Sequence, residues 1–134
     1  MKKDIPILKV EDLAIALVPR YNDINDELWD AFIINLKNEP IKSVLINSRG
    51  YGTIEGEKTK TSILRHFFKE INAKSFEQVE AVISSVFQLT NEFWVSFSYN
   101  DYLYDKKYIF VRGIVDENLI TKIPIINRRG IMIR

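Results

Sequence analysis

NEFWVSFSYNDYLYDKKYIFVRG, residues 91–113, carries the clearest strand pattern of this chain. Large apolar residues recur at every second position of its first half, at Phe93, Val95, Phe97 and Tyr99. A repeat of two residues is typical of a β-strand with one buried face. Residues 100–105 then predict a turn, and residues 108–112 predict the returning strand. We therefore expect a β-hairpin that places Phe93, Val95 and Phe97 in the core.

LWDAFIINLKNEPIKSVLINSRGYG, residues 28–52, has two runs rich in Ile, Val and aromatic residues on either side of Asn38-Glu39-Pro40. Polar residues and a proline between two such runs predict a second hairpin, with Pro40 in its turn. Shorter apolar runs at 7–10, 13–18, 123–126 and 131–133 predict further strands, with residues 128–130 turning between the last two.

The middle of the chain is open to two interpretations. Apolar residues at 63–71 and 76–89 fall on one face of a helix, but both segments are rich in β-branched and aromatic residues. We favour strands here, joined by a tight polar turn, with a short helical turn near residues 83–87. The alternative is an α+β fold with helices near 62–71 and 76–88.

The order of elements over residues 28–113 resembles that of immunoglobulin-like and fibronectin-like sandwiches, although the Cys–Trp–Cys signature of true immunoglobulin domains is absent. The expected fold class is therefore all-β, a two-sheet immunoglobulin-like β-sandwich. A length of 134 residues predicts one domain over residues 1–134.

Three stretches, LINSRGYG, NEFWVSFSYN and YDKKYIFV, make the whole chain similar to a small family of bacterial proteins. Some members of that family are labelled phenylalanine–tRNA ligase alpha subunit. The label would imply a class II catalytic core with motif arginines that hold ATP. None of those motifs can be placed on this sequence, so no site residue is carried over. We expect the chain neither to activate phenylalanine nor to ligate it to tRNA.

Composition limits the chemistry that is available. There are 19 Lys and Arg against 18 Asp and Glu, so no global charge attracts nucleic acid or anionic membrane. The absence of cysteine excludes disulfides, thiolate nucleophiles and cysteine-held metals. The longest apolar run near the N-terminus, residues 13–18, is too short for an export signal or a membrane span. We expect a cytoplasmic protein with no membrane association.

His66 is the only histidine and lies in ILRHFFKEI, residues 63–71. A catalytic or metal-binding histidine needs partners, and the neighbouring sequence supplies only Arg65, Lys69 and Glu70. We therefore expect a structural role for this stretch, with Ile63, Leu64, Phe67 and Phe68 buried and His66 at the polar margin. No catalytic residue, cofactor or metal site is predicted.

Two other polar stretches lack the pattern of a functional site. RGYGTIEGEK, residues 49–58, matches no phosphate-binding pattern and predicts a mobile loop between strands. The acidic run Asp23, Asp26, Glu27 and Asp30 predicts a solvated edge.

The expected function is a non-enzymatic protein-interaction or structural module. Its partner is another protein or a second copy of the chain. The alternative is RNA or nucleotide binding through an aromatic–basic surface, which is less favoured because Asp101, Asp105, Glu55 and Glu57 are interleaved with the basic residues. In either case the candidate ligand contacts are Arg49, Tyr51, Arg65, His66, Lys106 and Lys107.

Overall fold

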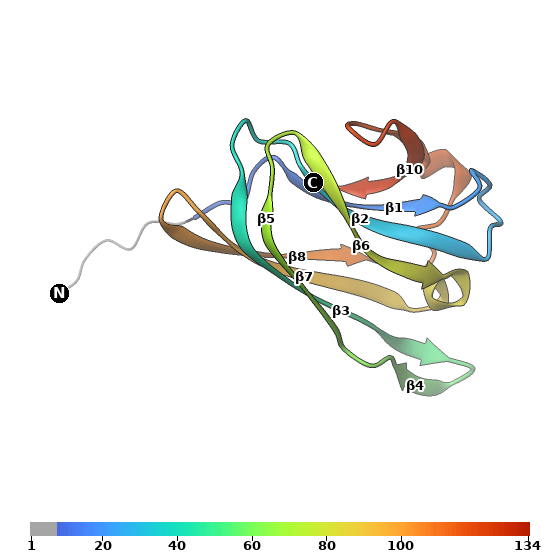
Figure 1. Ribbon diagram of the computed structural model, residues 1–134. Helices are drawn as coiled ribbons and strands as arrows, with labels where there is room; N and C mark the ends of the chain where they lie inside the picture. Colours follow the sequence, from blue (N-terminus) through green and yellow to red (C-terminus); the bar gives the residue numbers. More distant parts are fainter. Residues whose placement is uncertain (1–7) are drawn as a thin grey trace.

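The computed structural model describes residues 8–134, and they form two antiparallel sheets that pack face to face (Figure 1). The first sheet has the order β6-β2-β1-β10-β9, with strands at Ser75–Ile83, Leu28–Asn35, Leu13–Pro19, Arg128–Ile133 and Thr121–Ile123. In the second sheet β3 is central, and its strands β3, β4, β5, β7 and β8 are Ile41–Ile54, Glu57–Lys60, Leu64–Ile71, Thr90–Tyr99 and Tyr102–Phe110. The expected all-β sandwich is confirmed.

The helices of the alternative α+β fold do not form. Residues 64–71 are strand β5 and residues 75–83 are strand β6, because their β-branched and aromatic residues suit strands, and these pair with β3 and β2. The expected helical turn is confirmed as the 3-10 helix η1 at Ser84–Gln88, and a second one, η2, spans Glu117–Leu119.

The hairpin at residues 91–113 is confirmed as β7 and β8. Its turn is shorter than expected, since Tyr99 already pairs with Tyr102. Asn100 and Asp101 form the turn with φ of 52° and 67°. Positive φ at both central residues is what a two-residue turn between twisted strands requires. Phe93, Val95 and Phe97 are buried as predicted.

Residues 28–52 do not form a hairpin, and this prediction is wrong. Strand β2 pairs with β1 and β6, whereas β3 pairs with β4, β5 and β7 of the other sheet. Residues 36–40 therefore cross between the sheets, as the turn after β5 also does. The inward-facing residues Ala31 and Ile33 of β2 meet Val44 and Ile46 of β3 in the main core, so the two strands belong to stacked sheets and do not pair edge to edge.

Asn35 holds the two crossings together. This side chain is fully buried, and its Nδ2 donates to the carbonyls of Glu39, Ile71 and Asn72 at 2.9, 3.3 and 3.1 Å. Its Oδ1 accepts from the backbone N–H of Lys37 at 3.0 Å. One amide thus satisfies backbone groups of both crossings that no strand partner reaches.

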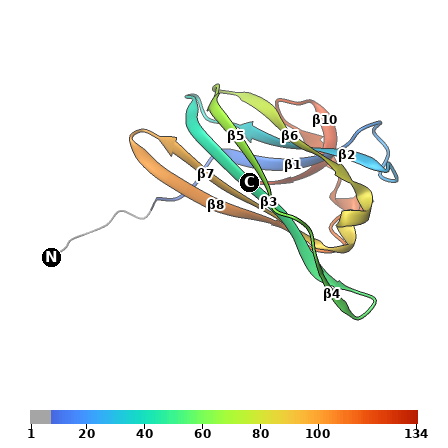
Figure 2. The same ribbon diagram turned by 60° about the horizontal axis from the view of Figure 1, so that its bottom comes forward.

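The glycine-bearing stretch 49–58 is ordered structure rather than a loop. It forms the end of β3, a turn at Glu55-Gly56 and the start of β4. Both turn residues have positive φ, 49° and 81°. This hairpin extends beyond the body of the sandwich (Figure 1, Figure 2).

The ends of the chain differ from expectation in detail. Residues 8–10 form no strand, and Ile7 lies outside the described residues. The last two strands are β9 and β10 with the turn at residues 124–127, so residues 128–130 belong to β10 rather than to a turn. This turn covers part of the outer face of the first sheet, where Ile123, Ile125 and Ile126 pack on a small second core.

The main core lies between the two sheets and contains Trp29, Phe97, Tyr108 and Phe110 among its largest side chains. No helix within residues 8–134 is long and apolar enough to cross a membrane.

Candidate functional site

The second sheet has one side toward the core and one toward solvent, and we call its solvent side the outer face. One row of side chains crosses four strands on this face. In this row Arg65 of β5 lies opposite Asn47 of β3, Asn47 opposite Trp94 of β7, and Trp94 opposite Lys107 of β8. Asn47 Oδ1 is buried and has no hydrogen-bond partner among residues 8–134.

Large apolar side chains of the outer face are exposed to solvent. They are Leu45, Phe67, Trp94 and Leu103, at 38%, 63%, 39% and 79% exposure. Leu45 lies directly opposite Phe67, and a shallow hollow of about 430 Å³ brings Leu45, Phe67 and Leu103 together. Apolar groups gathered in this way on one face are characteristic of contact surfaces.

Trp94 is fixed in place by its neighbours. Its indole Nε1 donates to Asp105 Oδ2 at 3.0 Å, and Lys107 Nζ lies 4.6 Å from the ring centroid. These contacts hold the exposed ring in one orientation before any partner binds.

Some basic side chains of the outer face are paired with an acidic side chain and others are not. Arg49 is paired with Glu92 at 3.1 Å and its guanidinium lies 5.1 Å from the Tyr51 ring. Arg65 and Lys69 form no ion pair with any residue the structure describes. The face therefore keeps an excess of positive charge beside its apolar residues.

Four of the six predicted contact residues share this face, namely Arg49, Tyr51, Arg65 and Lys107. The other two point to the opposite side of the same sheet. Lys106 lies opposite the buried Val95 on edge strand β8, with its ammonium 5.0 Å from the Tyr108 ring. His66 lies opposite the buried Ile46 on the other edge.

His66 has partners that its neighbouring sequence does not supply. Its Nε2 lies 2.7 Å from Oε1 of Glu80 on β6, and Ser48 Oγ on β3 donates to the same oxygen at 2.7 Å. The Glu80 side chain is 15% exposed and that of His66 is 25% exposed. These three residues, the Ser48–Glu80–His66 cluster, link the two sheets at one edge.

The apolar neighbours of His66 are less buried than expected. Ile63, Leu64 and Phe67 are about half exposed or more, and only Phe68 packs on the main core. The expectation of four buried side chains is wrong because Ile63 precedes β5, Leu64 is the first residue of this edge strand, and Phe67 lies on its solvent-facing side.

The cluster does not have the arrangement of a hydrolase. In a Ser–His–Asp triad the imidazole contacts the serine hydroxyl, whereas here the carboxylate of Glu80 lies between His66 and Ser48. Within residues 8–134 no three His, Cys, Asp or Glu side chains are grouped so as to hold a metal.

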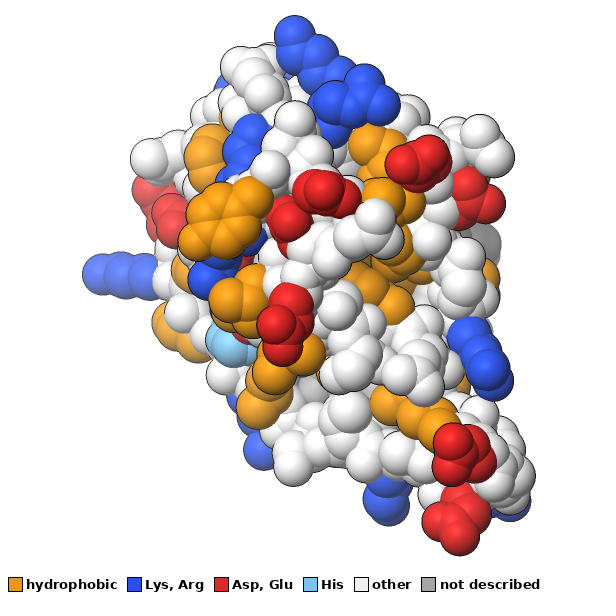
Figure 3. All heavy atoms as spheres, turned by 90° about the vertical axis from the view of Figure 1, so that its right-hand side faces the viewer, with side chains coloured by type: hydrophobic (Ala, Val, Ile, Leu, Met, Phe, Trp, Pro, Cys, Tyr) orange, Lys and Arg blue, Asp and Glu red, His pale blue; other side chains and the backbone are white. Residues whose placement is uncertain are grey.

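A cavity of about 250 Å³ opens beside this cluster, between β3, β5, β6, β7 and η1. Glu80 and Ser48 line it, together with apolar side chains that include Leu17, Val82 and Phe87. In Figure 3, which views this end of the molecule, the pale blue His66 lies at the surface beside apolar and acidic side chains.

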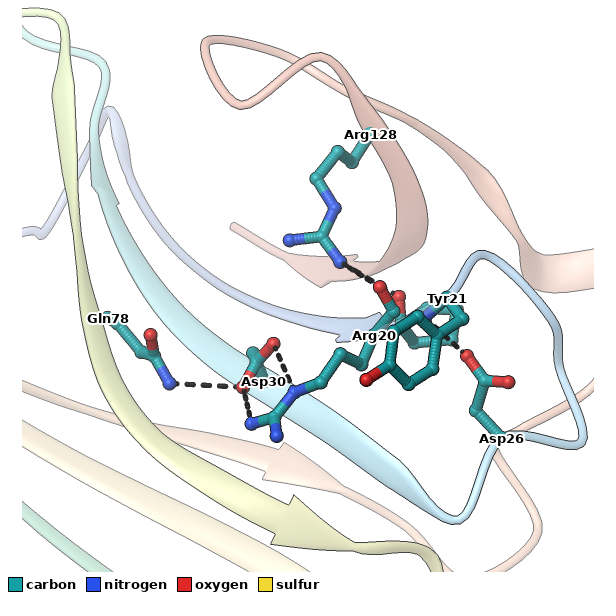
Figure 4. A network of polar contacts seen from close by, with 7 residues as sticks. Arg20, Tyr21, Asp26, Asp30, Gln78 and Arg128 are labelled. Atoms are coloured by element: carbon teal, nitrogen blue, oxygen red, sulfur yellow. Dashed lines mark hydrogen bonds and ion pairs between the residues drawn. The ribbon is translucent and has the colours of Figure 1, made fainter.

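Asp23 and Glu27 of the acidic run are exposed as expected, but Asp30 is not part of a solvated edge. Asp30 is only 6% exposed and accepts hydrogen bonds from Arg20 at 2.7 and 3.3 Å and from Gln78 at 3.0 Å (Figure 4). The hydrogen bond and charge of Asp30 raise the pKa of Arg20 above its usual value. Arg128 donates to the carbonyls of Pro19 and Arg20. This network joins β1, β2, β6 and β10, so its role is structural.

No protein family, curated protein or solved structure was found to match this chain. The immunoglobulin-like character and the resemblance to the bacterial family therefore stay predictions.

Proposed function

We propose that this protein is a non-enzymatic interaction module that binds a protein partner through the outer face of the second sheet. The observation that carries the proposal is the exposure of Leu45, Phe67, Trp94 and Leu103 on that face. Exposed apolar area is a cost to a protein that stays alone in water, and a partner removes that cost by covering it.

Trp94 is the expected centre of the contact. Tryptophan is enriched among residues that dominate binding energy, and a ring already held by Asp105 and Lys107 loses little freedom on binding. Phe67 and Leu45 extend the same apolar surface across two more strands.

The charge of the face specifies the partner's chemistry. Arg65, Lys69 and Lys107 favour a partner whose apolar surface is flanked by Asp or Glu. A symmetric dimer through this face would instead bring like positive charges together, because both copies present the same patch. The charge therefore supports a different protein over a second copy.

Nucleic acid fits this face less well. Single-strand binding relies on open aromatic faces for base stacking, but Lys107 already covers one face of the Trp94 ring. Asp105 lies on the same surface and would repel phosphates. RNA binding remains the alternative function, and the crosslinking experiment distinguishes it from protein binding.

The experiment places a photo-crosslinking phenylalanine analogue at position 67, in cells that naturally contain the protein. Its matched control has the analogue at position 76, because Phe76 is an exposed phenylalanine, at 40%, on β6 of the other sheet. Crosslinked species are identified by mass spectrometry, with and without ribonuclease. The isolated partner is then titrated against the purified protein.

The proposal expects one protein that crosslinks at position 67 and not at position 76. That protein must also bind the purified chain, and more weakly at high salt. Crosslinks to RNA would favour the nucleic-acid function, and crosslinks between two copies would favour self-association. Equal crosslinking at both positions would show that the outer face has no special role.

A further inference from the structure

The cavity beside Glu80 exists because the chain leaves a gap in the edge of the second sheet. Residues 61–63 separate β4 from β5, so β3 near Gly50 pairs with β7 on one side and has no strand partner on the other. Thr61 bridges the gap, since its N–H donates to the Gly50 carbonyl and its Oγ1 accepts from the Gly50 N–H. A Cβ atom at position 50 would lie 3.2 Å from both Asn91 and Thr61, so glycine permits the close approach of Thr61 to β3.

The walls of the cavity are mainly apolar. They include Leu17 and Phe93 from the core, Val82 from β6, and Val86 and Phe87 from η1. An engineered apolar cavity of roughly 150 Å³ is enough to bind benzene. A cavity of about 250 Å³ therefore has room for a phenyl ring with a short chain attached.

Glu80 is positioned at this apolar cavity, which Arg49 and Glu92 also line as an ion pair with a distance of 3.1 Å. Glu80 Oε1 accepts from both Ser48 and His66, which fixes the orientation of the carboxylate. Its Oε2 accepts no hydrogen bond from the residues that the structure describes. The second oxygen is thus left for a donor that comes from outside the protein.

We propose that this cavity binds a small amphipathic amine, with its ammonium group on Glu80 and its apolar part against Val82, Val86 and Phe87. A charged donor suits a carboxylate in a partly buried site, where a charge-assisted hydrogen bond is stronger than a neutral one. A ligand carboxylate would be repelled by the same group. This site is distinct from the outer face, so the proposal of an amine ligand does not depend on the proposal of a protein partner.

The experiment titrates the isotope-labelled protein with three ligands that share a phenylethyl group and follows its amide NMR signals. Phenethylamine carries an ammonium, phenethyl alcohol a neutral hydroxyl, and hydrocinnamate a carboxylate. We expect phenethylamine to shift the signals of residues 80–87 and to bind about tenfold or more tightly than the alcohol. Hydrocinnamate should leave the signals unchanged.

Two substitutions on one strand isolate the contribution of Glu80. Glu80→Gln should weaken phenethylamine binding about tenfold or more, and Glu77→Gln, on the exposed part of β6, should leave it unchanged. Val86→Phe fills part of the cavity without touching the carboxylate and should abolish binding. Spectra of each variant without ligand confirm that it is folded.

Equal affinity for phenethylamine and phenethyl alcohol would overturn the proposal, because the carboxylate would then recognise nothing. Shifts outside residues 80–87 and the facing strands would equally show that the ligand binds elsewhere. The three-ligand comparison uses the unaltered protein, so it decides the matter even if Glu80→Gln fails to fold.

Discussion

Ser48 and Glu80 are joined by a hydrogen bond of 2.7 Å that runs from the second sheet to the first. His66 contacts the same carboxylate oxygen, also at 2.7 Å. The edge of the sandwich is therefore closed by a polar cluster rather than by apolar packing alone, and its members come from three strands.

The His66–Glu80 contact should contribute to stability. Both side chains are mostly shielded from water, so a double-mutant cycle with His66→Ala and Glu80→Ala should give a coupling energy of about 0.5–2 kcal/mol in the free energy of unfolding. The exposed pair Arg134–Asp12 serves as the control and should couple by less than about 0.5 kcal/mol. Equal coupling in the two cycles would show that the cluster does not brace the edge. Chemical denaturation provides the measurement.

Asn35→Asp should destabilise the protein strongly. The change replaces an amide that donates to three carbonyls with a buried carboxylate facing the same oxygens. We expect a loss of about 3 kcal/mol or more in the free energy of unfolding at pH 7. Asn38→Asp, outside the strands on the same crossing, should change it by less than about 0.5 kcal/mol. A small effect at position 35 would mean that the crossings are held by other contacts.

The His66–Glu80 contact and the hydrogen bonds of Asn35 join residues far apart in the chain, and the sequence alone does not predict such contacts. The β7–β8 hairpin follows from local alternation and an Asn-Asp turn, so it could be predicted. Whether β2 and β3 share a sheet could not, because an apolar run does not indicate which strand it pairs with, and pairing depends on residues far away in the chain. The partners of His66 were missed for the same reason. Glu80 becomes its neighbour only once the turn after β5 is known to cross between the sheets.

The outer face was only partly predictable. Its basic and aromatic members, Arg49, Tyr51, Arg65 and Lys107, were singled out by residue type. Phe67 was assigned to the core because ILRHFF is rich in apolar residues, and hydropathy alone does not distinguish the two faces of an edge strand. Leu103 was missed because it was placed in a turn.

Two phenylalanines test the assignment of faces. Phe97→Ala should cost about 3–5 kcal/mol, because the ring is fully buried and leaves a cavity. Phe67→Ala should change the free energy of unfolding by less than about 0.5 kcal/mol, since that ring is largely exposed. Urea denaturation of both variants distinguishes the two faces. A large loss at position 67 would show that β5 is packed differently.

Tyr108 should make stability depend on alkaline pH. Its hydroxyl donates to the Leu13 carbonyl of the other sheet at 2.9 Å, and burial raises the pKa of Tyr108 above its usual value near 10. The neutral hydroxyl is therefore favoured in the folded state, so this contribution is full below about pH 10 and is lost as pH rises toward the folded pKa.

Tyr108→Phe should accordingly cost about 1–2 kcal/mol at pH 7, and the difference from the unaltered protein should shrink above about pH 10. The denaturation midpoints of Tyr108→Phe and of the unaltered protein, measured at pH 7 and above about pH 10, provide the check. The exposed Tyr102, replaced by Phe, should show no such dependence. A constant difference across this range would contradict the proposed role of burial.

The most direct test of the proposed interaction is the affinity of the purified partner for two variants that each remove one exposed phenylalanine. Phe67→Ala removes a side chain from the outer face, and Phe76→Ala removes one from the first sheet. Calorimetric titration should show binding weakened roughly tenfold or more by the first change and less than about twofold by the second. Equal affinities of the two variants would contradict the assignment of the outer face as the binding surface.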